Sequence, residues 1–183
     1  MIFEEKKITL KNGATAILKT PEISDGEKML NLIRTASGET DFLVRYKEDW
    51  EETTVESEEK WIKNNRESEN DWVITCFIDE KAVGCCEISF INGSKTFHRA
   101  GIGISVLKEY WNIGIGSAMF REIISLAQEH KDTEILELEF IEGNERAKAL
   151  YEKFGFREIC VKPKAYKLKN GTYQNSVYMQ KFL

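Results

Sequence analysis

The feature that most constrains this chain lies at residues 101–130, where a strand pattern meets a helix pattern at two glycines. Residues Gly101–Leu107 form an apolar run typical of a buried strand, and apolar residues recur at helical spacing from Ile115 onward. Gly114 and Gly116 carry no Cβ, so the backbone between the two elements can approach a bound group closely. The free N–H groups at the start of the helix favour an anion there. These residues alone predict either a cradle for a phosphate or diphosphate, or a tight turn without a ligand.

The composition restricts the classes of function. A chain of 183 residues without repeats, linkers or low-complexity tracts predicts a single domain, 1–183. A net charge of −5 and a pI near 5.3 argue against nucleic-acid binding by phosphate neutralisation, and they suit a cationic substrate. No apolar run approaches the roughly 20 residues of a membrane span, and the first seven residues lack the apolar core of a signal peptide. We therefore expect a cytoplasmic protein without nucleic-acid or membrane partners.

The cysteines follow neither a metal-site spacing nor a disulfide framework. They lie in apolar, strand-like runs, and two of them are adjacent, so those two side chains point to opposite faces of a strand. We expect buried, reduced thiols and no metal, for a set that comprises Cys76, Cys85, Cys86 and Cys160 with the two histidines His98 and His130.

The remaining patterns predict alternating helices and strands. Capping signals at Ser24–Glu27 and Thr53–Glu56 predict two helices that end near Gly38 and Ser68. Alternating apolar residues predict an opening hairpin or bent strand at 8–18, a hairpin at 72–90, a strand at 134–141, a short helix ending at Gly155, and final strands at 156–161 and 173–183. This order predicts a mixed α/β fold, with one central sheet of about seven strands and helices on both faces.

Two motifs together resemble the GNAT acetyltransferase superfamily, which writes them R/Q-x-x-G-x-G/A and N-x-x-A-x-x-L-Y-x-x-x-G-F. The second motif matches at every specified position of Asn144–Phe156, and the first departs once, at Trp111, where Arg or Gln is usual. That departure removes a polar side chain near the expected diphosphate but leaves the backbone donors. The element order is similar to the family across nearly the whole chain, and the ending 170–179 is similar to those of polyamine and ribosomal-protein N-acetyltransferases.

The resemblance implies a GNAT-like acyl-CoA N-acyltransferase fold, acetyl-CoA as the donor and no metal. The diphosphate of acetyl-CoA would lie on the glycine turn, and its pantetheine arm would pair with the strand before the turn. The N–H near Val106 would stabilise the carbonyl oxygen during acyl transfer. The residues so implied in cofactor binding are Ser105, Val106, Trp111, Asn112, Ile113, Gly114, Ile115, Gly116, Ser117, Asn144 and Tyr151.

The reaction that the resemblance implies requires two proton transfers, because the amine must lose a proton before attack and the thiolate gains one afterwards. Tyr151 matches the family position whose phenol protonates the departing sulfur; the alternative is an ordinary core aromatic. Glu139 is the candidate base, sharing a strand face with Glu137; the alternative is a solvated face. Glu87, His98 or a water chain could also accept the proton.

Acceptor binding is expected in the variable first third of the chain. Residues 42–52 interleave aromatic and acidic side chains and can arch over the acceptor, unless they form only a solvated loop. The candidate substrate-binding residues are Phe42, Tyr46, Glu87 and Glu137.

The function expected from the sequence is an N-acetyltransferase that moves acetyl from acetyl-CoA to a primary amine by direct attack in a ternary complex. The acceptor would be a small molecule such as a polyamine, an amino acid or an antibiotic. The alternatives are a peptide N-terminus, as in ribosomal-protein acetyltransferases, or a non-catalytic acetyl-CoA-binding module. A Rossmann-type nucleotide site is disfavoured because the third glycine of its fingerprint is missing. A homodimer is possible.

Overall fold

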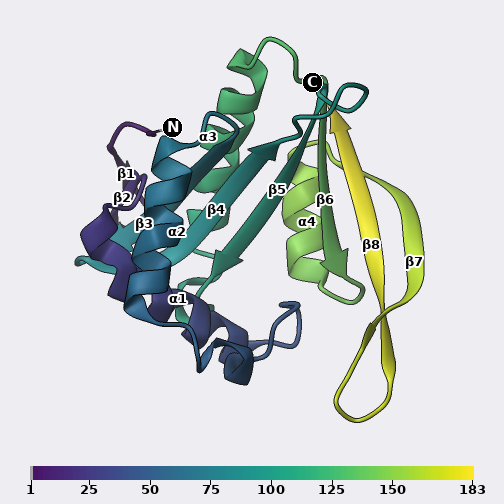
Figure 1. Cartoon of the computed structure of the whole chain (residues 1–183), viewed down its shortest axis with the longest axis horizontal. Helices are drawn as coiled ribbons and strands as arrows, with labels where there is room; N and C mark the ends of the chain where they lie inside the picture. The colour runs from purple at the N-terminus through teal and green to yellow at the C-terminus, as the bar shows by residue number, and fades with distance from the viewer. Residues whose placement is uncertain (1) are drawn as a thin grey trace.

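The computed structural model describes residues 2–183, which form one eight-stranded sheet with four α-helices (Figure 1). The strands are β1 (Lys6–Thr9), β2 (Thr15–Lys19), β3 (Asp71–Ile78), β4 (Lys81–Phe90), β5 (Arg99–Val106), β6 (Ile135–Ile141), β7 (Arg157–Lys167) and β8 (Tyr173–Phe182). The helices are α1 (Gly26–Glu39), α2 (Val55–Glu67), α3 (Ile115–Glu129) and α4 (Glu145–Lys153), with short 3-10 turns at Ile23–Asp25, Lys47–Trp50 and Lys108–Tyr110.

The sheet contains one parallel pair, and that pair is incomplete. The strand order is β1-β2-β3-β4-β5-β6-β8-β7, and neighbouring strands are antiparallel except for β5 and β6. These two pair over only three positions, Arg99–Gly101 against Ile135–Glu137. Beyond them the strands diverge, and Figure 1 shows β5 and β6 spreading apart with α4 visible between them. The sheet is therefore split at its centre.

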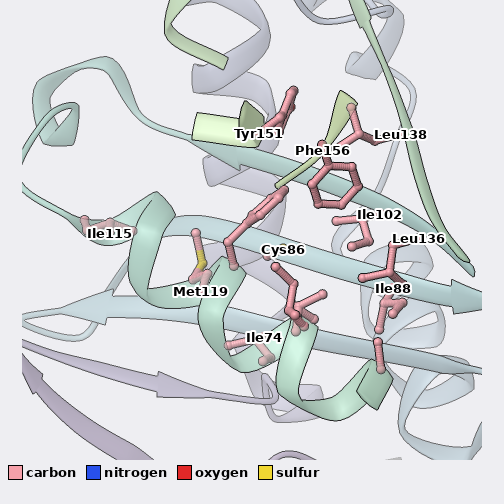
Figure 2. Close-up of a cluster of buried hydrophobic side chains, with 14 of the residues drawn as sticks. Ile74, Cys86, Ile88, Ile102, Ile115, Met119, Leu136, Leu138, Tyr151 and Phe156 are labelled. Carbon is pink, nitrogen blue, oxygen red and sulfur yellow. The ribbon is translucent and has the colours of Figure 1, made fainter. Parts of the chain in front are cut away.

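Two apolar cores cover the two faces of the sheet. On one face, α3 and Tyr151 of α4 pack on residues such as Cys86, Ile88 and Leu136, and Figure 2 shows this cluster. On the other face, α1 and α2 enclose a smaller core that includes Met29, Ile62 and Phe77. Adjacent Cys85 and Cys86 belong to opposite faces, as the strand alternation predicts.

The sequence prediction of a mixed α/β fold with one central sheet and helices on both faces is confirmed. The sheet has eight strands, one more than expected, because the opening segment forms two strands around Asn12-Gly13. β7 extends to Lys167, and the β7–β8 hairpin reaches beyond the rest of the sheet (Figure 1). No helix among residues 2–183 combines the length and the apolar character that crossing a membrane requires.

Three local expectations are wrong. The capping box before α1 is formed by Glu22 and Asp25 on the preceding turn, because the helix begins only at Gly26. The cap of α2 is Thr54, whose hydroxyl accepts from the Ser57 N–H at 3.2 Å, one residue later than expected. Cys160 is exposed, because β7 is an edge strand with solvent on both faces, although all four cysteines are free thiols.

Candidate active site

The split between β5 and β6 opens into a cavity of about 940 Å³. One half of its lining comes from the end of β5, the glycine turn, the start of α3 and one side of α4. The other half comes from α1, α2, β4 and the segment 40–50. We call the first the turn half and the second the helical half.

The edge of β5 that faces the cavity carries backbone groups free to pair with a ligand. The N–H of Ile91 donates to the carbonyl of Arg99 at 3.0 Å, and the N–H of Leu107 donates to that of Val83 at 3.0 Å. Because of these bonds, the odd-numbered residues of β5 turn their backbone N–H and carbonyl groups toward β4. Beyond the part of β5 that pairs with β6, the even-numbered residues Ile104 and Val106 therefore direct their N–H groups toward the split. The expected donor at Val106 therefore faces the cavity.

The edge of β6 that faces β5 across the split also carries backbone groups that point toward the cavity. The N–H of Leu183 donates to the carbonyl of Glu134 at 2.9 Å, and the N–H of Glu142 donates to that of Asn175 at 3.1 Å. Even-numbered residues of β6 thus bond to β8, and Glu139 and Ile141 direct their backbone groups toward the split, where the carbonyl of Ile141 accepts the Asn144 N–H at 3.2 Å. A molecule in the cavity can pair with a strand edge on either side.

The two positions of the turn require glycine for different structural reasons. Gly114 caps α3 with φ at +105°, a conformation that side chains rarely adopt. Gly116 lies where α3 approaches α4, because a Cβ there would come within 3.2 Å of Leu150 Cδ2. Asn112 is also left-handed, with φ at +65°. The carbonyl of Ile113 accepts the Lys11 N–H at 3.0 Å, and Ile113, unlike its neighbours, does not border the cavity.

Trp111 has a defined role in the structure. Its indole Nε1 donates to the carbonyl of Val106 at 2.7 Å, which fixes the end of β5. The guanidinium carbon of Arg146 lies 3.4 Å from the centre of its ring. Arg146 comes from the first turn of α4, across the split, so α4 supplies a cation near the position where the family motif has Arg or Gln.

Three cations border the glycine turn: Arg146, Lys11 and Lys153, whose Nζ donates to Ser117 Oγ at 3.1 Å. Within the described part of the chain none of them pairs with a carboxylate, and burial lowers the pKa of Arg146. The sequence did not single them out. The only available signal was their position, since Arg146 and Lys153 fall on unspecified positions of the second motif.

Tyr151 and Asn144 border the turn half from α4. Tyr151 is 7% exposed and lies near the rings of Phe120 and Phe140, with centroids 5.4 and 5.6 Å away. Burial raises the pKa of the Tyr151 phenol, which therefore stays protonated. Asn144 Oδ1 accepts the Ala147 N–H at 3.2 Å and caps α4, so its amide nitrogen is the group left to donate to a ligand.

The helical half combines apolar walls with two carboxylates. Its walls include Met29, Leu32, Ile33, Ala36, Phe42, Leu43, Trp50, Trp61 and Tyr110. Glu58 of α2 and Glu87 of β4 border the same space, and burial raises the pKa of both carboxyls, with the nearby charge of Asp71 adding to the effect at Glu87. Gly103, opposite Glu87 on β5, leaves room for it, since a Cβ there would lie 2.9 Å from Glu87 Oε1. Glu58 was missed because it lies in a run of glutamates that reads as a solvated helix face.

Glu139 borders the cavity but is already engaged. It forms an ion pair with Lys162, accepts a hydrogen bond from Ser176 Oγ at 2.9 Å, and is exposed. Glu87, in contrast, has no hydrogen-bond or ion-pair partner among residues 2–183. The geometry therefore favours Glu87 over Glu139 as a proton acceptor, although the base remains a prediction.

Other candidates lie apart from this cavity. Glu137 accepts from Arg99 and, at 2.7 Å, from the Tyr178 hydroxyl, away from the cavity lining. Tyr46 borders a neighbouring cavity instead. The carbonyl of His98 accepts the Glu134 N–H at 2.8 Å where β5 and β6 are still paired. The cavity thus brings together most, but not all, of the residues expected from the sequence.

This arrangement has a recognisable form: a split mixed sheet with a glycine turn bordered by cations, beside a second space bordered by carboxylates. The chain belongs to the acetyltransferase (GNAT) family, whose sequence pattern matches residues 35–156. The resemblance drawn from the two motifs is confirmed.

Known proteins similar to this chain carry related descriptions. An L-amino acid N-acetyltransferase (AaaT) of Escherichia coli K12 is 34% identical over 102 residues, which cover 56% of this chain and 62% of that relative. A GNAT-family acetyltransferase from Streptococcus pneumoniae has a similar structure, with a TM-score of 0.85 at 25% identity over 92% of this chain and 99% of that one. A ribosomal-protein-alanine N-acetyltransferase from Brucella melitensis shares the fold, with a TM-score of 0.78 at 20% identity over 91% of this chain and 99% of that one.

Proposed function

We propose that this protein transfers an acetyl group from acetyl-CoA to the amino group of an amino-acid-type acceptor with an apolar side chain. The observation that carries the proposal is Glu87, a solvent-exposed carboxylate with a raised pKa and without a hydrogen-bond or ion-pair partner among the described residues, which borders the cavity beside β5. The name of the E. coli relative, an L-amino acid N-acetyltransferase, supports an acceptor of this type.

The turn half fits the donor. The N-terminal N–H groups of α3 favour a diphosphate, and Arg146, Lys11 and Lys153 add positive charge around the turn of an acidic protein. The inward N–H groups of β5 can pair with the amide groups of the pantetheine arm, and Asn144 can donate to the arm from α4. Acetyl-CoA supplies an activated acyl group as a thioester.

The acceptor amine must lose a proton before it can attack, and Glu87 can take it. The pKa of its carboxyl is raised and so lies closer to neutral pH, and a general base works best when its pKa is near the working pH. Before that step, the negative charge of Glu87 attracts the ammonium form. The new C–N bond forms as the C–S bond breaks, and the N–H of Val106 donates to the carbonyl oxygen as it gains negative charge.

The departing sulfur leaves as a thiolate and must end as a thiol. Tyr151 has a proton available, because its pKa is raised above the ordinary value of about 10. A thiol with a pKa near 8.5 is a stronger acid than this phenol, so full transfer from Tyr151 is uphill. Tyr151 therefore acts chiefly by donating a hydrogen bond to the sulfur, and the proton that completes the thiol is replaced from solvent.

A covalent acyl-enzyme is not needed. Cys85 borders the cavity, but burial raises the pKa of its thiol, which keeps it protonated and weakly nucleophilic. Direct attack by the amine is the simpler course.

The experiment combines thiol release from acetyl-CoA with calorimetry of CoA binding. The acceptor panel contains amino acids, amino-acid amides, peptides, polyamines and aminoglycosides. We expect turnover with amines that carry an apolar side chain. Binding of CoA without turnover of any acceptor would support the non-catalytic binding module instead.

A further inference from the structure

A stacked pair of side chains, Trp111 and Arg146, joins the two sides of the split at the turn half. Trp111 follows the short turn after β5, and Arg146 belongs to the first turn of α4, which follows β6. The guanidinium carbon lies 3.4 Å from the centre of the indole ring. That separation is van der Waals contact, so the guanidinium lies with its face against the ring and no N–H group stands between them.

The indole that makes this contact is itself fixed. Its Nε1 donates to the carbonyl of Val106 at 2.7 Å, at the short end of the range for an N–H donor. The backbone N–H of Trp111 donates to the carbonyl of Lys108 at 3.2 Å and closes the turn Lys108–Tyr110. Backbone and side chain of Trp111 are therefore both bonded, and the ring presents a fixed surface to α4.

Among residues 2–183, the guanidinium of Arg146 has no hydrogen-bond or ion-pair partner. A cation in the first turn of a helix lies at the positive end of the helix dipole, and partial desolvation lowers the pKa of this guanidinium. Both effects disfavour the charge. Within the described chain, the contact that offsets them is the one with the ring of Trp111.

Stacking engages one face of the guanidinium and leaves its rim free. The five N–H groups lie in the plane of the guanidinium, and two parallel donors match two oxygens of a phosphate. Arg146 and Trp111 both border the cavity at the glycine turn. A ring that fixes the plane of the guanidinium also restricts the direction of its donors. Without the ring, binding of the ligand would have to order this long side chain, at a cost in affinity.

We propose that Trp111 is a positioning residue of the donor site, whose ring orients the guanidinium of Arg146 for the diphosphate of CoA before CoA binds. The inference rests on the proposed function, because it takes acetyl-CoA as the donor. It goes further because Trp111 acts through Arg146, and the two residues work as one unit. Tryptophan then has a role at the one position where the first motif departs from its usual residues.

The test is calorimetry with CoA and with pantetheine, which lacks the phosphates. The ratio of the two dissociation constants measures the preference for CoA, and a general effect on the end of β5 cancels in that ratio. Trp111→Leu removes the ring. We expect it to reduce the preference for CoA by about 2- to 30-fold, the range that corresponds to a cation–π contact. Thermal unfolding of each variant verifies that the fold is intact.

Three further variants separate the ring from other roles of Trp111. Trp111→Phe keeps an aromatic face and loses the indole N–H, so it should retain most of the preference for CoA. Arg146→Lys keeps the charge and loses the planar group, so it should lose much of that preference. In an Arg146→Ala background, Trp111→Leu should cause no further loss, since no guanidinium is left to orient.

The matched control is Trp50→Leu in the helical half. The indole of Trp50 is also hydrogen-bonded, to Ser37 Oγ at 3.0 Å, and the guanidinium carbon of Arg45 lies 4.7 Å from the centre of its ring. This second pair borders the same cavity away from the glycine turn. Its loss should therefore leave the preference for CoA over pantetheine unchanged.

The outcomes separate this inference from the proposed function. An unchanged ratio in Trp111→Leu, an equal loss in Trp111→Phe, or a full preference for CoA in Arg146→Lys would overturn positioning by the ring. Additive losses in the double variant would do the same, because the two residues would then act independently. CoA binding without turnover of any amine would refute catalysis and leave this inference standing. A parent protein that does not bind CoA would refute both.

Discussion

The two halves of the cavity are built in different ways. The turn half relies on backbone: N–H groups of β5, the first turn of α3, and a glycine at φ +105°. The helical half relies on side chains from four separate segments, with Glu58, Glu87 and aromatic walls. Under the proposed function, the turn half would recognise the donor through geometry that few residue types can adopt. The helical half would recognise the acceptor through chemistry that many sequences can supply.

This difference determines how substitutions should act. A change in the helical half alters charge or shape beside the acceptor, so it should affect the chemical step or the choice of amine. A change in the turn half should affect donor affinity. If variants in both halves changed donor affinity and the chemical step alike, the cavity would work as a single site.

The largest effect is expected for Glu87→Gln, which keeps the shape of the side chain and removes its basicity. Loss of a general base lowers kcat by about 10²- to 10⁴-fold. The measurement is steady-state thiol release at saturating acetyl-CoA. The matched control is Glu139→Gln, which removes a carboxylate already paired with Lys162 and should have little effect. A larger loss in the Glu139 variant would reassign the base to β6.

Tyr151→Phe is expected to lower kcat by about tenfold to a thousandfold, at or below the range for general acid–base catalysis. The ring remains in the core next to Phe120 and Phe140, so stability should change little. Phe154→Leu, which alters the neighbouring aromatic packing, is the control for a purely structural effect. If kcat of Tyr151→Phe matched the parent, Tyr151 would be a core residue only.

Arg146→Ala tests the turn half and should weaken CoA binding by about 10- to 100-fold. The estimate follows from the roughly 1.5–3 kcal/mol of a hydrogen bond to a charged group, at 1.4 kcal/mol for each factor of ten. Calorimetry with CoA and with pantetheine distinguishes a phosphate contact from a general loss, because pantetheine lacks the diphosphate. Arg157→Ala, an exposed arginine on β7, is the control. Equal weakening for both ligands would place Arg146 away from the diphosphate.

The same contrast explains what the sequence could predict. The glycine turn and the Asn144–Phe156 run were readable because Gly114 needs a left-handed backbone, Gly116 needs the close approach of Leu150, and Asn144 must cap α4. These requirements leave residue-specific patterns, and they led to the correct fold and family. Hydrophobic alternation likewise located most strands to within a few residues, whereas β7 continues six residues beyond the expected end at Val161.

The helical half could not be predicted as well because its geometry depends on tertiary structure. Glu58 is one of several glutamates on α2, and only the packing of α1 and α2 shows that it borders the cavity. Glu137 and Glu139 share a strand face as expected, but Arg99 and Lys162 from distant segments engage them. Trp111 was interpreted as the loss of a polar side chain near the diphosphate, and the guanidinium of Arg146 over its ring became visible only once α4 was placed across the split.

The smallest expected effect is on protein stability and comes from the carboxylate of Glu87. It tests most directly whether the helical half keeps a group for function at a cost to folding. Burial raises the pKa of Glu87 in the folded state above its unfolded value of about 4.3. The folded protein therefore binds this proton more tightly, and the stability linked to it is fully present below the unfolded pKa and is lost as the pH rises through the folded pKa. Glu87→Gln carries no charge at any pH, so it should be more stable than the parent at neutral pH and nearly equal to it at strongly acidic pH.

We expect the Tm of Glu87→Gln to exceed that of the parent by a few degrees at most at pH 7, since about 1 kcal/mol shifts Tm by about 2–4 °C in a domain of this size. Thermal unfolding of both proteins between pH 4 and pH 8 measures the difference. Asp25 provides a contrast, because hydrogen bonds and ion pairing with Lys28 lower its pKa despite burial, and Asp25→Asn should therefore destabilise the protein at neutral pH. A carboxylate kept at a cost to folding is what a proton acceptor in the helical half requires. A Glu87→Gln variant less stable than the parent at pH 7 would show that Glu87 is structural.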